Sequence, residues 1–178
     1  MEATSTPLTT TSVALRYGLL LAVSSILIDF LVRVAGLSFM TYGIVAGVGA
    51  LAVAIIWMVL AHSAFKRAND NRMSFVQGLT IAVIMVLISA IIASVFNYVY
   101  LHYIDTDFVE RMKVGMTEFM ERNNVPEDQI EKSTAKFDEM NAGLGLSLWN
   151  GLKNGVIGGL VLGAIVSAFT KRSAPEFE

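Results

Sequence analysis

Two long apolar runs constrain this chain more than any other feature of its sequence. Residues 34–65 and residues 73–104 each extend over 32 positions without an Asp, Glu, Lys or Arg. A helix needs about 20 apolar residues to cross the roughly 30 Å of hydrocarbon in a bilayer, so each run can hold one complete span. We expect these spans to be helices, because an open strand would leave backbone groups unpaired in lipid.

Two further spans flank these runs. Residues 13–34 carry only three charged side chains, and residues 140–170 carry only Lys153. The whole chain is 54% hydrophobic and 16% charged, whereas a soluble domain is roughly 25% charged. The sequence therefore predicts an all-α, integral membrane four-helix bundle that forms a single domain over residues 1–178. The expected spans are residues 13–34, 40–62, 74–99 and 148–170.

Basic residues in the connecting segments predict the orientation of these spans. Lys66, Arg67 and Arg72 lie between the second and third spans, and Lys171 and Arg172 follow the fourth. Short cytoplasmic loops carry an excess of Lys and Arg. We therefore expect a multi-pass membrane protein with both termini in the cytoplasm.

The segment between the third and fourth spans, residues 105–142, is then extracytoplasmic. It holds ten acidic and five basic residues. Apolar residues recur at helical spacing on both sides of Asn123 and Asn124, and Pro126 begins the second part. They are Phe108, Met112, Met116, Phe119 and Met120, then Ile130, Phe137 and Met140. This pattern predicts two amphipathic helices, which either cover the ends of the spans or bind a partner through a methionine-rich face.

Small residues recur at every fourth position of the fourth span. The stripe comprises Ser147, Gly151, Gly155, Gly159, Gly163 and Ser167, and Gly143 extends it. Such a stripe allows another helix to approach closely. The cover is either another span of the same chain or a second copy in a homo-oligomer. A weaker stripe on the second span makes that span a candidate cover: Gly43, Gly47, Ala50 and Ala54.

Ionisable residues within spans are functional candidates by default. Asp29 should lie on the order of 8 Å inside the outer boundary of the bilayer. Asn97, Lys153 and Asn154 should lie at a similar depth, and Arg33 lies on the same face of the first span as Asp29, so that these five residues would form one polar cluster. The cluster is either an ion or proton site with Asp29 as the binding group, or a structural contact near the interface. The i, i+4 spacing of Asp29 and Arg33 permits an ordinary ion pair.

Several functional classes are excluded or disfavoured. The net charge of −2 argues against nucleic-acid binding. The absence of cysteine leaves no thiolate metal site or Cys nucleophile. We find no catalytic or cofactor-binding motif, and His62 and His102 have no second ligand at metal-binding spacing. Four aromatic residues are expected at the membrane interface: Tyr98, Tyr100, Tyr103 and Trp149.

Three stretches together resemble a known family. Arg16-Tyr17-Gly18 enters the first span, Met73-Ser74-Phe75-Val76-Gln77-Gly78 enters the third, and Asn97-Tyr98-Val99-Tyr100-Leu101-His102-Tyr103-Ile104-Asp105 ends it. With the glycine-rich last span, they resemble the bacterial membrane family called domain of unknown function 4199 (DUF4199). Thr106 departs from the proline expected there. The resemblance implies a four-span inner-membrane protein and supplies no activity.

These observations favour a non-enzymatic structural, accessory or assembly component of the membrane. Its expected partners are the lipid bilayer and either a second copy or another envelope protein, which would bind through residues 106–141. The alternative is a small oligomeric transporter or channel that uses Asp29 together with Lys153 or Arg33.

Overall fold

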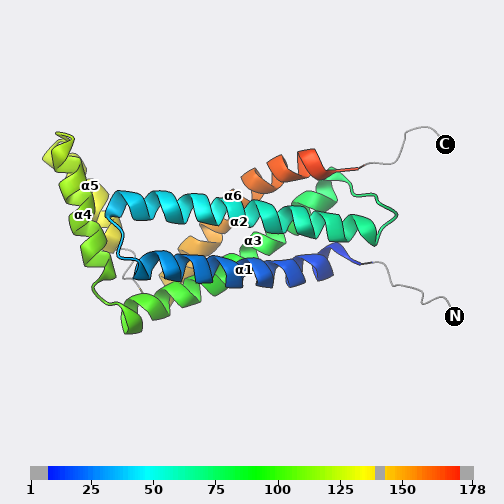
Figure 1. The fold of residues 1–178 in the computed structure, drawn as a ribbon, viewed down its shortest axis with the longest axis horizontal. Coiled ribbons are helices and arrows are strands. Elements are labelled where there is room, and N and C mark those ends of the chain that lie inside the picture. Colours follow the sequence, from blue (N-terminus) through cyan, green and yellow to red (C-terminus); the bar gives the residue numbers. More distant parts are fainter. Residues whose placement is uncertain (1–7, 139–142, 173–178) are drawn as a thin grey trace.

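The computed structural model describes residues 8–138 and 143–172, and this part of the chain is helical apart from its turns and one isolated antiparallel bridge between Met73 and Arg172. Four long helices are apolar enough to cross a membrane. They are α1 (Thr10–Val34), α2 (Phe39–Arg67), α3 (Phe75–Val99) and α6 (Leu144–Thr170) (Figure 1). A π-helical turn, η1 (Tyr100–Ile104), extends α3. The predicted all-α fold with four apolar helices is therefore confirmed.

Several helices extend beyond the predicted limits of the spans, and two of them, α1 and α3, begin at a side-chain cap. α2 continues five residues beyond position 62, and α6 begins four residues before position 148. Hydropathy marks only the part of a helix that fits the hydrocarbon, whereas the helix itself continues until its backbone is capped. At the start of α3, Ser74 Oγ accepts a hydrogen bond from the Gln77 backbone, and Gln77 Oε1 accepts one from the Ser74 backbone. This capping box fixes the entry into the third span.

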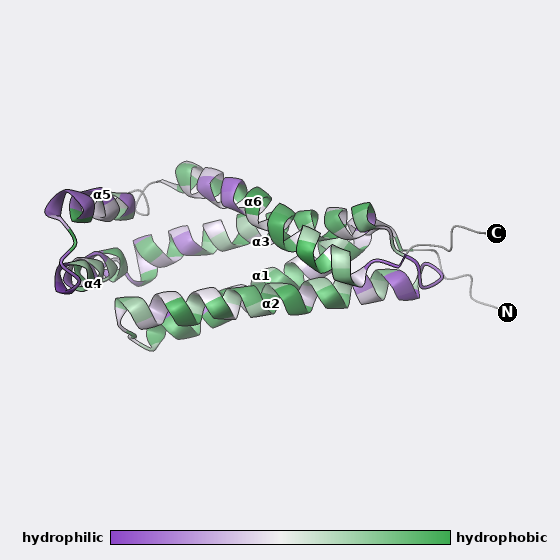
Figure 2. Ribbon diagram, turned by 90° about the horizontal axis from the view of Figure 1, so that it is seen from above, coloured by the Kyte–Doolittle hydropathy of each residue, from purple (hydrophilic) through white to green (hydrophobic). Residues whose placement is uncertain are grey.

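α3 is the central helix of the bundle. It packs extensively against α6 and α1, and α1 packs in turn against α2. In the half nearer α4 and α5, α3 lies between α6 and the α1–α2 pair (Figure 2). The buried core of the other half includes Met58, Phe65, Ile81 and Met85. α6 approaches α2 only through a small contact region.

The segment between α3 and α6 forms the two predicted helices, α4 (Phe108–Arg122) and α5 (Glu127–Asp138). They lie at the end of the bundle opposite to the start of α1 and the end of α6 (Figure 1). Phe108 and Met112 of the predicted stripe are buried, whereas Phe119 is 39% exposed. α4 contacts the bundle through its first turns, which leaves its last turn uncovered. Met140 lies outside the described residues.

Candidate functional site

An ion pair between Asp29 and Arg33 joins three helices at the α4–α5 end of the bundle. Arg33 Nε donates to Asp29 Oδ2 at 2.7 Å, and Arg33 Nη2 donates to Asn97 Oδ1 of α3 at 2.9 Å. The Tyr42 hydroxyl of α2 donates to Asp29 Oδ1 at 3.1 Å. The Arg33 side chain is 7% exposed and that of Asp29 is 29% exposed. Asp29 is therefore neutralised and held by two donors.

Aromatic rings connect this ion pair to α4. The Arg33 guanidinium carbon lies 4.6 Å from the ring centroid of Tyr100 and 4.6 Å from that of Phe108, the first residue of α4. A cation over aromatic rings is attracted by about 2 kcal/mol or more where the pair is desolvated. Both rings belong to one buried cluster with Leu101 and Val109. Arg33 thus holds the first turn of α4 against the bundle.

A second ion pair fixes the turn between η1 and α4. Arg111 Nη2 donates to Asp105 Oδ2 at 2.6 Å, and the Tyr100 hydroxyl donates to the same oxygen at 3.2 Å. The hydrogen bond from Arg111 holds the pKa of Asp105 below its usual range, and the same bond raises the pKa of Arg111. The carboxylate is thereby kept charged where the chain leaves the third span.

Lys153 and Asn154 share a cleft with the ion pair without bonding to it. The cleft has a volume of about 850 Å³ and lies between α6 and the α1–α2 pair, with α3 lining it in between and Lys136 of α5 at its edge. Its polar lining includes all five residues of the predicted cluster together with Ser147: Asp29, Arg33, Asn97, Ser147, Lys153 and Asn154. Among residues 8–138 and 143–172, Lys153 forms no ion pair with Asp29. The structure therefore joins Asp29, Arg33 and Asn97 directly and places the other two across the cleft.

The stripe of small residues on α6 faces α3 of the same chain. A Cβ built at Gly155 would lie 3.0 Å from the Ala90 Cβ, and one built at Gly163 would lie 2.8 Å from the Ala82 Cβ. Gly151 and Gly159 likewise face Ser94 and Val83. Ser147 Oγ donates to the Ser94 carbonyl at 3.4 Å, and Ser167 is fully buried.

The expectation that the second span covers this stripe is wrong. Gly43 and Gly47 have no atom within 4 Å of a built Cβ, so they stand at an open surface of α2. Ala54 instead packs against the core that contains Met58 and Ile81. The central position of α3 separates the two stripes.

His62 lies at the opposite end of the bundle and is fully buried. Its Nε2 donates to the Gly78 carbonyl at 3.0 Å, and its Nδ1 lies 2.7 Å from the Thr170 hydroxyl. The Lys66 ammonium donates to the Thr170 carbonyl at 2.9 Å. Gly78 ends the Phe-x-Gln-Gly stretch, and a Cβ there would lie 2.8 Å from Ser167 Oγ. The stretch thus brings the start of α3 against α2 and the end of α6.

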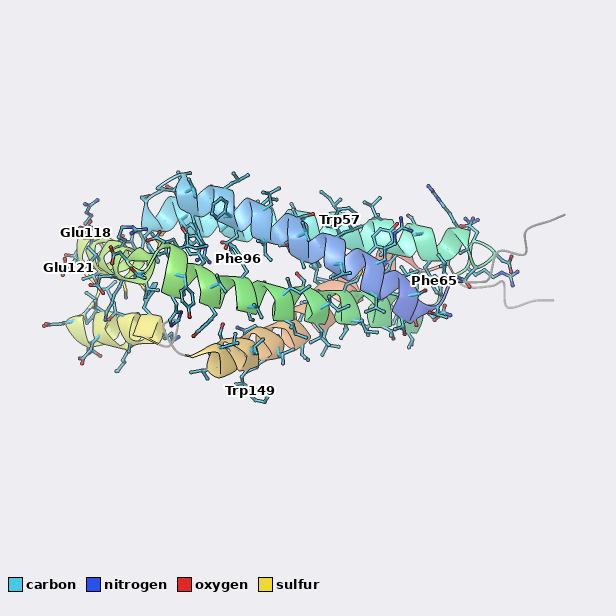
Figure 3. All side chains as sticks on the ribbon, turned by 90° about the horizontal axis from the view of Figure 1, so that it is seen from below. Trp57, Phe65, Phe96, Glu118, Glu121 and Trp149 are labelled. Atoms are coloured by element: carbon cyan, nitrogen blue, oxygen red, sulfur yellow. The ribbon has the colours of Figure 1, made fainter. Side chains whose placement is uncertain are left out.

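Sequence reasoning missed the aromatic partners of Arg33. Tyr100 was expected at the membrane interface, but it is 2% exposed and packs against Phe30, Phe96 and Phe108. The signal that could have revealed this arrangement is the spacing of Tyr100 and Asp105, which lie five residues apart. The π-helical turn brings two side chains at this spacing together. Trp149, by contrast, is 64% exposed and points away from the bundle (Figure 3).

The arrangement can hold an anion or a polar headgroup more readily than it can perform acid–base chemistry. Asp29 is occupied by its own partners, whereas Lys153 lines the cleft without an ion pair to Asp29. Within the described residues, no three His, Cys, Asp or Glu side chains are grouped as metal ligands. The cleft is therefore the candidate site, and its cationic groups are the candidate binding groups.

Comparison with known proteins identifies the family. A profile described as protein of unknown function (DUF4199) matches residues 16–172, which is most of the chain. No curated protein and no solved structure matches the chain. The match covers α1 from residue 16 onward, the other three apolar helices completely, the Arg33 network and the Phe-x-Gln-Gly stretch. The chain therefore belongs to the DUF4199 family.

Proposed function

We propose that this protein is a non-enzymatic structural or accessory component of a bacterial inner membrane. In this proposal, the four-helix bundle holds α4 and α5 at the extracytoplasmic face, where they meet an envelope partner. The observation that carries the proposal is the Arg33 network. In this network, Asp29 and Arg33 of α1 contact residues of α2, α3 and α4.

The chemistry of this network favours a structural role over transport. An ion-translocating carboxylate must exchange its partner during each cycle, whereas Asp29 accepts hydrogen bonds from both Arg33 and Tyr42. Removing one member of a buried charge pair leaves the other uncompensated, which is strongly destabilising. The pair is therefore suited to fixing the position of α4.

The direct test is Asp29→Asn, measured for both stability and flux. We expect the free energy of unfolding in detergent to fall by about 1–3 kcal/mol, because a charged hydrogen-bond acceptor is lost. Ion and solute flux in proteoliposomes should stay at the level of protein-free liposomes for both the native chain and the variant. The control is Asp128→Asn, which removes an exposed i, i+4 pair with Lys132 on α5 and should change neither quantity.

The alternative function is a small oligomeric transporter or channel. The cleft that Asp29 and Lys153 share favours it, because the cleft lies between membrane-spanning helices. This alternative requires flux by the native chain, and it requires Asp29→Asn to abolish that flux while the free energy of unfolding stays unchanged. That pair of results would replace the structural proposal.

The proposed orientation and partner surface are tested by site-specific chemistry. The native chain contains no cysteine, so single cysteines at Arg67 and Glu131 report opposite ends of the bundle. A membrane-impermeant maleimide should label the cysteine at position 131 alone in cells whose inner membrane is intact. Labelling only at position 67 would reverse the proposed orientation.

The partner surface is tested by photocrosslinking. A photocrosslinker at exposed Val114 of α4 should give a discrete protein adduct, whereas one at exposed Val48 of α2 should give none.

A further inference from the structure

The cleft between α6 and the α1–α2 pair has an excess of positive charge. Its ionisable lining consists of Asp29, Arg33, Lys136 of α5 and Lys153 of α6. Among the residues that the structure describes, three cations therefore line the cleft with one carboxylate, which is an excess of two positive charges. Because Asp29 is already paired with Arg33, it does not balance the positive charges of Lys136 and Lys153.

Neither lysine has an acidic partner among the side chains that the structure describes, those of residues 8–137 and 143–172. The structure gives no ion pair for Lys136 or Lys153 in this part of the chain. Lys153 stands on a helix whose neighbouring exposed residues, Val156 and Ile157, are apolar. Arg33 also lines the cleft, and its Nη1 is buried without a hydrogen-bond partner in the described part of the chain. Charged groups at this depth are costly unless an opposite charge or water meets them.

The shape of the cleft admits an amphiphile from the bilayer. Alanines at positions 46 and 50 of α2 and at positions 90 and 93 of α3 keep its surfaces open. Both walls are membrane-spanning helices, so the space between them lies beside lipid rather than beside bulk water. Ile26 and Ile28 add apolar surface next to the polar groups. The cleft thus combines apolar walls with a cationic end.

We propose that this cleft binds an anionic phospholipid from the leaflet on the α4–α5 side. The lipid phosphate lies between Lys136 and Lys153, and an acyl chain follows the alanine-lined walls. Basic pockets between transmembrane helices are suited to anionic lipid headgroups. A zwitterionic lipid is disfavoured, because its ammonium group would face the two lysines. Lipid binding also joins α5 to α6 through a shared anion.

The test is a lipid titration of the full chain in detergent, followed by native mass spectrometry. Phosphatidylglycerol should bind more tightly than phosphatidylethanolamine. Each of Lys136→Gln and Lys153→Gln should weaken phosphatidylglycerol binding about five-fold, and the double variant about 25-fold. The matched control is Lys132→Gln, because Lys132 lies on α5 outside the cleft and is 78% exposed in its pair with Asp128. This control should leave the affinity unchanged.

Four results would overturn the proposal. The first is equal affinity for the anionic and the zwitterionic lipid. The second is an equal loss of affinity in the Lys132 control and in the two cleft variants. The third is displacement of the lipid by glycerol phosphate, which has no acyl chain, because this would assign the site to a soluble phosphate. We expect glycerol phosphate to fail to displace the lipid at equal concentration. The fourth is a Lys153→Glu variant that still binds phosphatidylglycerol normally. As a stability control, circular dichroism melting in phosphatidylethanolamine should give the same midpoint for all variants.

Discussion

Gly163 stands where α6 packs directly against Ala82 of α3, and Gly163→Ala tests whether this stripe holds the bundle together. A Cβ at position 163 would lie 2.8 Å from the Ala82 Cβ. Ordinary van der Waals contact begins near 3.4 Å, so the two helices would have to separate by about 0.6 Å. The Ala82 Cβ is attached directly to the backbone of α3, which prevents relief by a change of rotamer.

The expected cost follows from this overlap. Adding a methyl group to a packed interface that cannot relax costs about 1–3 kcal/mol. Alanine also has a higher helix propensity than glycine, which offsets up to about 1 kcal/mol. Gly158→Ala is the matched control, because a Cβ at Gly158 has no atom within 4 Å. We expect Gly158→Ala to be neutral or stabilising and Gly163→Ala to be less stable than this control by about 1–3 kcal/mol.

The assay is equilibrium unfolding in mixed micelles, with a double-mutant cycle as the decisive step. Ala82→Gly in the Gly163→Ala background moves the methyl group from one helix to the other, so most of the lost stability should return. A coupling free energy of about 1 kcal/mol or more would be the signature of direct contact. If Gly163→Ala is as stable as Gly158→Ala, or if the double variant restores nothing, α3 does not cover this stripe.

Three further predictions concern the ends of the bundle. Arg33→Lys keeps the charge but loses the planar fork that bonds two partners at once, so amide hydrogen exchange in α4 should accelerate by an amount equivalent to about 1–3 kcal/mol. Because Arg111 lowers the pKa of Asp105, the stabilising ion pair is present at neutral pH and is lost as the pH falls through that lowered pKa. The protection of α4 amides against exchange should therefore be lower at neutral pH in Arg111→Gln than in the native chain, and the variant should lose less further protection on acidification than the native chain does. Ser74→Ala removes the capping box and should lower the free energy of unfolding by about 1 kcal/mol, whereas Ser74→Thr should retain most of it.

Local properties of the chain determined the spans and the two amphipathic helices. The apolar runs, the period of apolar residues in 108–120 and the break at Pro126 each act over one helix length, so the order of the residues is enough to reveal them. The same holds for the i, i+4 pairing of Asp29 with Arg33, which depends on helix geometry alone. The described helices follow these expectations within a few residues.

Only the tertiary structure decided which helix faces meet. A membrane-spanning helix is apolar on all sides, because lipid is as apolar as the protein interior, so its sequence does not mark the face that turns inward. The glycine stripe on α6 was recognisable, but its cover by α3 rather than α2 depends on how the helices are arranged in the bundle. Likewise, the burial of Tyr100 over Arg33 depends on the π-helical turn that redirects the chain into α4. The cleft beside Lys153 arises from the same arrangement, since α3 holds α6 away from the α1–α2 pair.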